Sequence, residues 1–184
     1  MNKKEKFKSI LYDYHVWLDY AIKQKKVADI LMDNIHKNKN DIFIIWSSVH
    51  FHFAMGIENG LKGLIIKNNP DQINLLETED NIIIKNIGGK GGKIHNLSSL
   101  ARLAGIFNRQ LNIYEAEVDY LYLENVLNHL SDCIKWISRY PIQNNLLNVY
   151  KYDSKKIPHP IIYGFHILDI IEPIFNLFEK ELDS

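Results

Sequence analysis

The polar residues best suited to chemistry lie in the first half of the 184-residue chain, between Ala54 and Leu64. Glu58 and Lys62 stand four positions apart in a segment that is otherwise largely apolar. The acidic residue comes first, which is the favourable order for an ion pair on a helix. Such a pair is either a plain surface salt bridge or part of a groove or subunit interface. We therefore take Glu58 and Lys62 as candidate binding residues.

Arg139 is a second candidate, since it precedes Tyr140 and Pro141 at the end of a predicted helix. A cation in the last turn interacts favourably with the helix dipole, and this alone is sufficient reason for an arginine there. The planar guanidinium also suits a phosphate, to which it donates parallel hydrogen bonds. The sequence leaves both interpretations open, so Arg139 joins the candidate binding residues.

The histidines do not form a recognisable metal motif. His50 and His52 are two positions apart and fall on different faces of a helix. His166 and Asp169 are three apart but have no further partner nearby in the sequence. Neither CxxC nor HExxH occurs. We therefore expect no metal site and no cofactor.

Nucleophilic and phosphate-loop chemistry also lack support. Cys133 lies among apolar positions of a strongly periodic helix, where a cysteine is expected to be packed rather than reactive. Residues 87–93 read IGGKGGK. They lack the first glycine and the final Ser or Thr of a phosphate loop, so they predict a flexible connector.

The composition is that of an ordinary folded protein, with 46% hydrophobic residues and a formal net charge of zero from 22 basic and 22 acidic side chains. A neutral chain has no overall basic field to hold nucleic acid without sequence preference. The single cysteine excludes an intrachain disulfide and fits a reducing compartment. The basic N-terminus leads into no apolar run typical of a signal peptide. We expect a cytoplasmic protein without membrane spans.

Apolar residues recur at steps of three and four along most of the chain, which is typical of amphipathic helices. The pattern predicts helices at about residues 7–35, 42–67, 97–104, 113–137 and 161–182. The expected fold is all-α, an antiparallel bundle of four main helices with a short additional helix, in one domain spanning residues 1–184. Residues 82–84 could form a short strand. Gly56, Gly60 and Gly63 indicate that neighbouring segments approach the second helix closely.

Three motifs resemble HEPN domains (higher eukaryotes and prokaryotes nucleotide-binding). Residues 54–64, AMGIENGLKGL, resemble the family's second helix, with its Ala-x-x-x-Glu-x-x-Leu-Lys-like pattern. Residues 93–97, KIHNL, followed by Leu100, resemble the Gly-His-Asp-Leu-x-x-Leu element that opens the next helix. Residues 136–141, WISRYP, resemble the Arg-Tyr-Pro ending of several subfamilies. The ordered set covers about residues 42–141.

The resemblance implies an antiparallel helical bundle, often a homodimer. Many members are ribonucleases, toxins or parts of antiviral defence systems, and others are noncatalytic or bind nucleotides. The ribonucleases carry an arginine followed after four to six residues by a histidine. This chain departs from that pattern, because the next histidine after Arg139 is His159.

Our leading hypothesis is a HEPN-like homodimer that binds RNA or a nucleotide without catalysis. It would be an accessory component of bacterial defence or stress, with a partner protein such as an antitoxin. A first alternative is a divergent, metal-independent, toxin-like ribonuclease acting at a homodimer cleft. Its candidate catalytic residues are Arg139 and Tyr140, together with His159 or His95, the histidine moving the proton. A second alternative is a plain helical protein-interaction module.

Overall fold

The computed structural model describes residues 1–37, 42–88, 95–115, 117–137 and 164–184, most of which are helical. The elements in chain order are α1 (Lys3–Leu11), α2 (Tyr14–Lys37), α3 (Ile42–Asn68), a 3-10 turn (Pro70–Gln72), β1 (Ile73–Glu77), β2 (Ile82–Ile87), α4 (Leu97–Leu103), a second 3-10 turn (Arg109–Leu111), α5 (Glu117–Asp132), a π-helical turn (Cys133–Ile137) and α7 (Gly164–Leu182). The predicted mainly helical class is confirmed.

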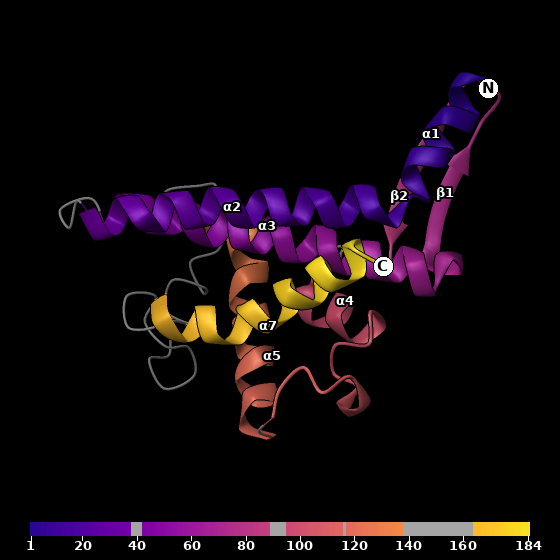
Figure 1. Cartoon of the computed structure of the whole chain (residues 1–184). Coiled ribbons are helices and arrows are strands. Elements are labelled where there is room, and N and C mark those ends of the chain that lie inside the picture. Colours follow the sequence, from indigo (N-terminus) through magenta and orange to yellow (C-terminus); the bar gives the residue numbers. More distant parts are fainter. Residues whose placement is uncertain (38–41, 89–94, 116, 138–163) are drawn as a thin grey trace, which may run out of the picture.

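The α2–α3 pair forms the long axis of the molecule (Figure 1). The two helices run antiparallel and lie side by side over most of their length. Helix α5 runs across this pair rather than alongside it, and α7 packs against both α2 and α5. The short α4 packs between α3 and α5.

The first predicted helix is wrong in one respect, because residues 7–35 form two helices with a break before Tyr14. The apolar stripe continues across the break, and the polar contacts there interrupt the helix. The Asp13 carboxylate accepts a hydrogen bond from the backbone N–H of His15 at 3.1 Å, as a residue capping a helix start does. The indole N–H of Trp17 donates to the carbonyl of Leu11 at 3.0 Å and fixes the bend.

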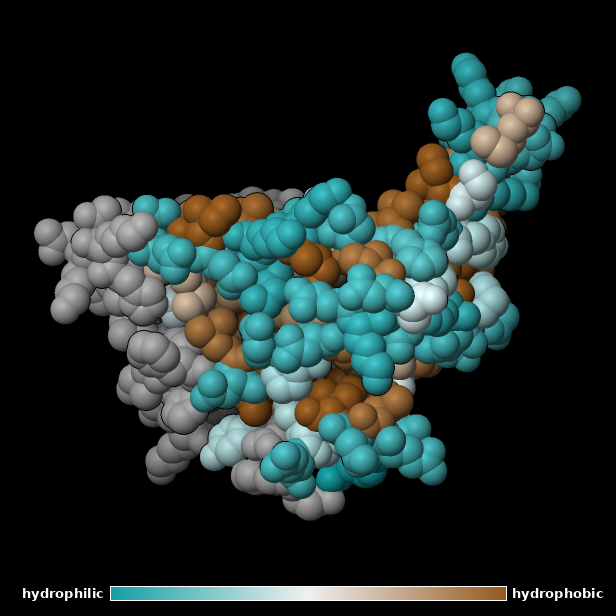
Figure 2. All heavy atoms as spheres, in the orientation of Figure 1, coloured by the Kyte–Doolittle hydropathy of each residue, from teal (hydrophilic) through white to brown (hydrophobic). Residues whose placement is uncertain are grey.

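Helix α1 and the two strands form an arm that projects from the helical body (Figures 1 and 2). The strands pair antiparallel, with Ile73 opposite Ile87. The Lys8 ammonium meets the Glu77 carboxylate at 2.7 Å and so ties α1 to β1. Hydrophobic residues gather at the base of the arm and hydrophilic ones cover its tip (Figure 2). The sequence predicted only part of β2 and missed β1.

Helix α3 lies at the centre of the core. Phe53, Ile57, Leu61 and Ile65 are almost completely buried. The glycines of α3 do mark close approaches, as expected. A Cβ at Gly60 would overlap the ring of Phe178 on α7. Within the described part of the chain, no helix combines the length and apolar character needed to cross a membrane.

We predict that Gly60→Ala lowers the free energy of unfolding by about 1–3 kcal/mol, because the new methyl group displaces the Phe178 ring from a filled core. Gly63→Ala is the matched control in the same helix. Its Cβ would lie 3.1 Å from the Cβ of Trp17, which is a tight contact but not an overlap, and alanine improves helix propensity by about 1 kcal/mol over glycine. Gly63→Ala should therefore be less destabilising than Gly60→Ala. Urea unfolding followed by circular dichroism measures both. Equal stabilities for the two variants would contradict the packing at Gly60.

Candidate functional site

The structure brings together three of the residues singled out in the sequence: Glu58, Lys62 and His95. The Glu58 carboxylate is only 5% exposed and forms an ion pair with the Lys62 ammonium one helical turn later. On its other side, both carboxylate oxygens lie 3.1 Å from Nδ1 of His95. His95 comes from a segment far along the chain, so the contact joins α3 to the start of α4. We call these three residues the Glu58 site.

The position of His95 is fixed by the residues that begin α4. The Asn96 side chain accepts a hydrogen bond from the backbone N–H of Ser99 at 2.8 Å, so Asn96 caps the helix. The backbone N–H of Leu97 donates to the hydroxyl of Ser131 on α5 at 2.9 Å. The same hydroxyl donates to the carbonyl of Leu127 at 2.6 Å. Helix α5 therefore holds the first turn of α4 in place, and His95 with it.

The Glu58 site has a buried carboxylate and a partly exposed imidazole. The carboxylate only accepts hydrogen bonds, so it favours the His95 tautomer with the proton on Nδ1. That leaves Nε2 with its lone pair, on a side chain that is 43% exposed. The Lys62 ammonium has three N–H donors, and the ion pair with Glu58 occupies only part of them. The arrangement can therefore hold a hydrogen-bonding ligand or carry a proton.

The other predicted catalytic and binding residues, Arg139, Tyr140 and His159, lie outside the described residues. The predicted approach of a histidine to Arg139 therefore stays a prediction. Of the four candidate catalytic residues, His95 is the one that lies within the described part of the chain.

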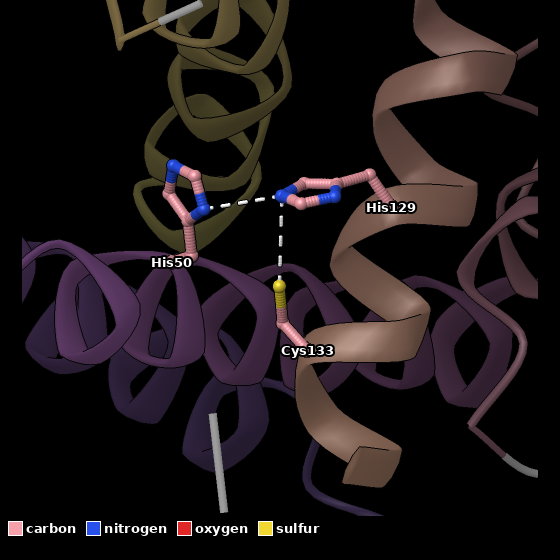
Figure 3. A group of neighbouring side chains, drawn as sticks. All are labelled: His50, His129 and Cys133. Carbon is pink, nitrogen blue, oxygen red and sulfur yellow. Dashed lines mark hydrogen bonds between the residues drawn. The ribbon is translucent and has the colours of Figure 1, made fainter. Parts of the chain in front are cut away.

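A second group of polar side chains lies inside the molecule, where the sequence indicated no site (Figure 3). Nδ1 of His50 on α3 lies 3.1 Å from Nε2 of His129 on α5. The same Nε2 lies 3.6 Å from Sγ of Cys133. His50, His129 and Cys133 are only 3%, 8% and 1% exposed, respectively. We call these three residues the His–Cys cluster.

Only part of this cluster could have been predicted from the sequence. His129 and Cys133 are four positions apart and share a helix face, which could have been noticed. His50 is 79 residues before His129. His52 lies apart from the cluster, with Nδ1 2.7 Å from the Gln24 side-chain oxygen. Cys133 is buried as predicted, but it lies beside a histidine as well as apolar residues.

Burial sets the charge of both histidines in the cluster. Desolvation lowers the pKa of His50 to about 3, with a smaller contribution from nearby His129. Burial alone lowers the pKa of His129 to about 4. Both imidazoles are therefore neutral at neutral pH and offer nitrogen lone pairs. Nε2 of His50 has no hydrogen-bond partner among the described residues.

Comparison of the chain with protein-family models, curated proteins and solved structures gave no match. The resemblance to HEPN domains therefore stands on the sequence motifs. Two of those motifs supply the Glu58 site, with Glu58 and Lys62 from one and His95 from the other.

We predict that acidification destabilises the protein because of the lowered pKa values of His50 and His129. Above about pH 7 both imidazoles are neutral in the folded and unfolded chains. As the pH falls through 6.5, the unfolded chain takes up protons that the folded chain does not bind until the pH nears 4 and 3. The free energy of unfolding should therefore decrease as the pH falls. Its slope against pH should approach the value for about two more protons bound by the unfolded chain than by the folded chain.

Urea unfolding between pH 7.5 and pH 5, with EDTA present, measures this slope. His129→Gln removes one of the two groups and should make the decline shallower by about one proton. His15→Gln, which removes an exposed histidine from α2, is the control. A stability that is constant between pH 7 and pH 5 would contradict neutral burial of the pair.

Proposed function

We propose that this chain is a HEPN-like helical protein that binds RNA or a nucleotide at the Glu58 site without cleaving it. One observation carries the proposal. Two sequence segments that resemble HEPN motifs, with Glu58 and His95 37 residues apart, meet in one hydrogen-bonded group. The group opens to solvent through the His95 ring. The antiparallel HEPN-like bundle is part of this proposal.

The charges in the site favour recognition of a nucleotide over nonspecific binding to a phosphate backbone. Glu58 neutralises Lys62, and the whole chain has no net charge. Long-range attraction to a polyanion is therefore weak. His95 presents an exposed ring on which an unstacked base can stack, as bases do on histidine in single-stranded RNA recognition. The remaining N–H donors of Lys62 suit a phosphate or ribose oxygen.

Glu58 acts in this scheme as a positioning residue. Its side chain is almost closed off from solvent, so a ligand meets Lys62 and His95 first. One carboxylate holds both side chains in fixed orientations, which reduces the entropy that binding must otherwise remove. This pre-organisation argues for a built binding site in preference to a surface ion pair.

The resemblance supports the wider setting of the proposal. We propose a cytoplasmic homodimer that acts as an accessory component of bacterial defence or stress, together with a partner protein such as an antitoxin. The single cysteine is consistent with a reducing compartment.

We predict that Lys62→Gln weakens binding of single-stranded RNA or a nucleotide about tenfold or more, because hydrogen bonds to charged groups contribute about 1.5–3 kcal/mol. Lys23→Gln is the matched control. It removes the same charge from an exposed i,i+4 ion pair with Asp19 on α2. Fluorescence anisotropy with labelled RNA, and calorimetry with single nucleotides, measure the affinity. Equal weakening by both substitutions would show that only general charge matters.

If the wild-type protein binds neither RNA nor a nucleotide, the proposal is wrong, and the alternative of a plain helical protein-interaction module is favoured. Circular dichroism of Lys62→Gln checks that the loss of a partner for buried Glu58 has not unfolded the chain. His95→Gln gives a second variant at the site that leaves the ion pair in place.

The Glu58–His95 contact specifically favours the second candidate function, a metal-independent ribonuclease. A carboxylate that orients an imidazole is the arrangement of a general base. In this scheme, Nε2 of His95 takes the proton of a ribose 2′-hydroxyl as that oxygen attacks the adjacent phosphorus. The bond from phosphorus to the 5′-oxygen of the next nucleotide breaks, that oxygen takes a proton from solvent, and a 2′,3′-cyclic phosphate remains. Arg139 would supply positive charge to the phosphate. RNA cleavage in the presence of EDTA, lost in both His95→Gln and Arg139→Ala, would replace the noncatalytic proposal.

A further inference from the structure

The His–Cys cluster has the spacing of a metal-binding site. One ligand atom from each of His50, His129 and Cys133 lies within 4.8 Å of the others. Zinc binds imidazole nitrogen at about 2.0–2.1 Å and cysteine sulfur at about 2.3 Å in a tetrahedron. Such a tetrahedron separates two nitrogens by about 3.3 Å, and nitrogen from sulfur by about 3.6 Å. Two of the three separations in the cluster, 3.1 Å and 3.6 Å, are close to these values, and the third, between His50 and Cys133, is within 4.8 Å.

Nε2 of His129 cannot hydrogen-bond well to both of its neighbours in the cluster at once. Nε2 of His129 faces both Nδ1 of His50 and Sγ of Cys133 (Figure 3). In a neutral imidazole, that nitrogen has either one lone pair or one proton, so it can make only one good hydrogen bond at a time. A cation at the centre of the three atoms would accept a lone pair from each.

We propose that His50, His129 and Cys133 bind a divalent transition metal of the zinc type between α3 and the end of α5. Two imidazoles and a thiolate are nitrogen and sulfur ligands, which suit zinc and not the oxygen-seeking magnesium or calcium. On binding, the Cys133 thiol loses its proton to solvent and the sulfur becomes a thiolate ligand. The imidazoles are already neutral and need release no proton.

The His–Cys cluster is closed to solvent, which determines how a metal would enter it and how the bound metal would affect stability. All three ligands are buried, and they join α3 to a segment about 80 residues later in the chain. The metal therefore enters during folding or when α5 moves away from α3. Once bound, it links two core elements and favours the folded chain over the unfolded one. A tetrahedral zinc takes four ligands, so it would bind one more ligand besides these three.

The first test is the metal content of the full chain, purified without a histidine tag and measured by elemental analysis. We expect about one zinc per chain. The protein is then unfolded with EDTA and a reducing agent, and refolded with Co²⁺. We expect visible d–d bands and a near-ultraviolet band from sulfur-to-cobalt charge transfer. Cys133 is the only cysteine, so that band in the wild-type chain reports on this residue alone.

Cys133→Ser should abolish the charge-transfer band, and His129→Gln should weaken metal binding at least tenfold. His52→Gln is the matched control, since it also removes a histidine from α3 but one that contacts Gln24. It should keep both the metal and the spectrum. Zinc should raise the thermal unfolding midpoint of the wild-type chain and of His52→Gln, and not that of Cys133→Ser.

Wild-type chain that refolds to its native circular dichroism spectrum in zinc or cobalt and retains neither would overturn the proposal. A cobalt spectrum without the charge-transfer band would also overturn it, because Cys133 would then not be a ligand. If Cys133→Ser fails to fold, the wild-type charge-transfer band and the His52→Gln control still decide the matter. The proposed binding of RNA or a nucleotide is assigned to the Glu58 site, so its outcome does not enter this test.

Discussion

The burial of α3 is the constraint on which the other features depend. This helix packs against α2, α4, α5 and α7, so the polar side chains that it buries must find partners inside the protein. Glu58 is paired with Lys62 and His95, His50 lies against His129, and His52 contacts Gln24. Both candidate sites follow from this constraint, because a largely apolar helix with a few polar residues brings distant polar groups together.

The glycines of α3 allow the neighbouring helices to pack closely around it. Gly56 lies against the backbone oxygen of Ala21 and the Phe175 ring, and Gly60 lies under Phe178. Without side chains at these positions, α2 and α7 approach the α3 backbone closely. The loss of helix propensity, about 1 kcal/mol for each glycine, is offset by the burial of two phenylalanine rings.

Sequence periodicity predicted the elements whose burial is one-sided and continuous, such as α4. It failed where a local polar contact opposed the apolar pattern, as at Asp13, which starts a new helix inside an unbroken stripe. It also missed β1, whose sequence INLLE shows no clean alternation. Glu58 and Lys62 were identified together as a helical pair and His95 separately, but the contact of His95 with Glu58 depends on how α4 docks on α3 and α5. That docking is a tertiary property, and spacing along the chain does not encode it.

The two sites are connected through the turn that joins the end of α5 to the π-helical segment after it. His129 and Cys133 lie on either side of Ser131, whose hydroxyl accepts the hydrogen bond from the first turn of α4. The same turn therefore carries two of the cluster's three residues and fixes the start of the helix that presents His95. A metal bound by the cluster would restrain this turn against α3, and α3 also carries Glu58. Glu58 lies on α3 and His95 immediately before α4, and this turn contacts both helices. Metal binding would therefore narrow the range of distances between Glu58 and His95. In this arrangement a buried metal would affect the Glu58 site without touching its ligand, by pre-organising the groups that meet it.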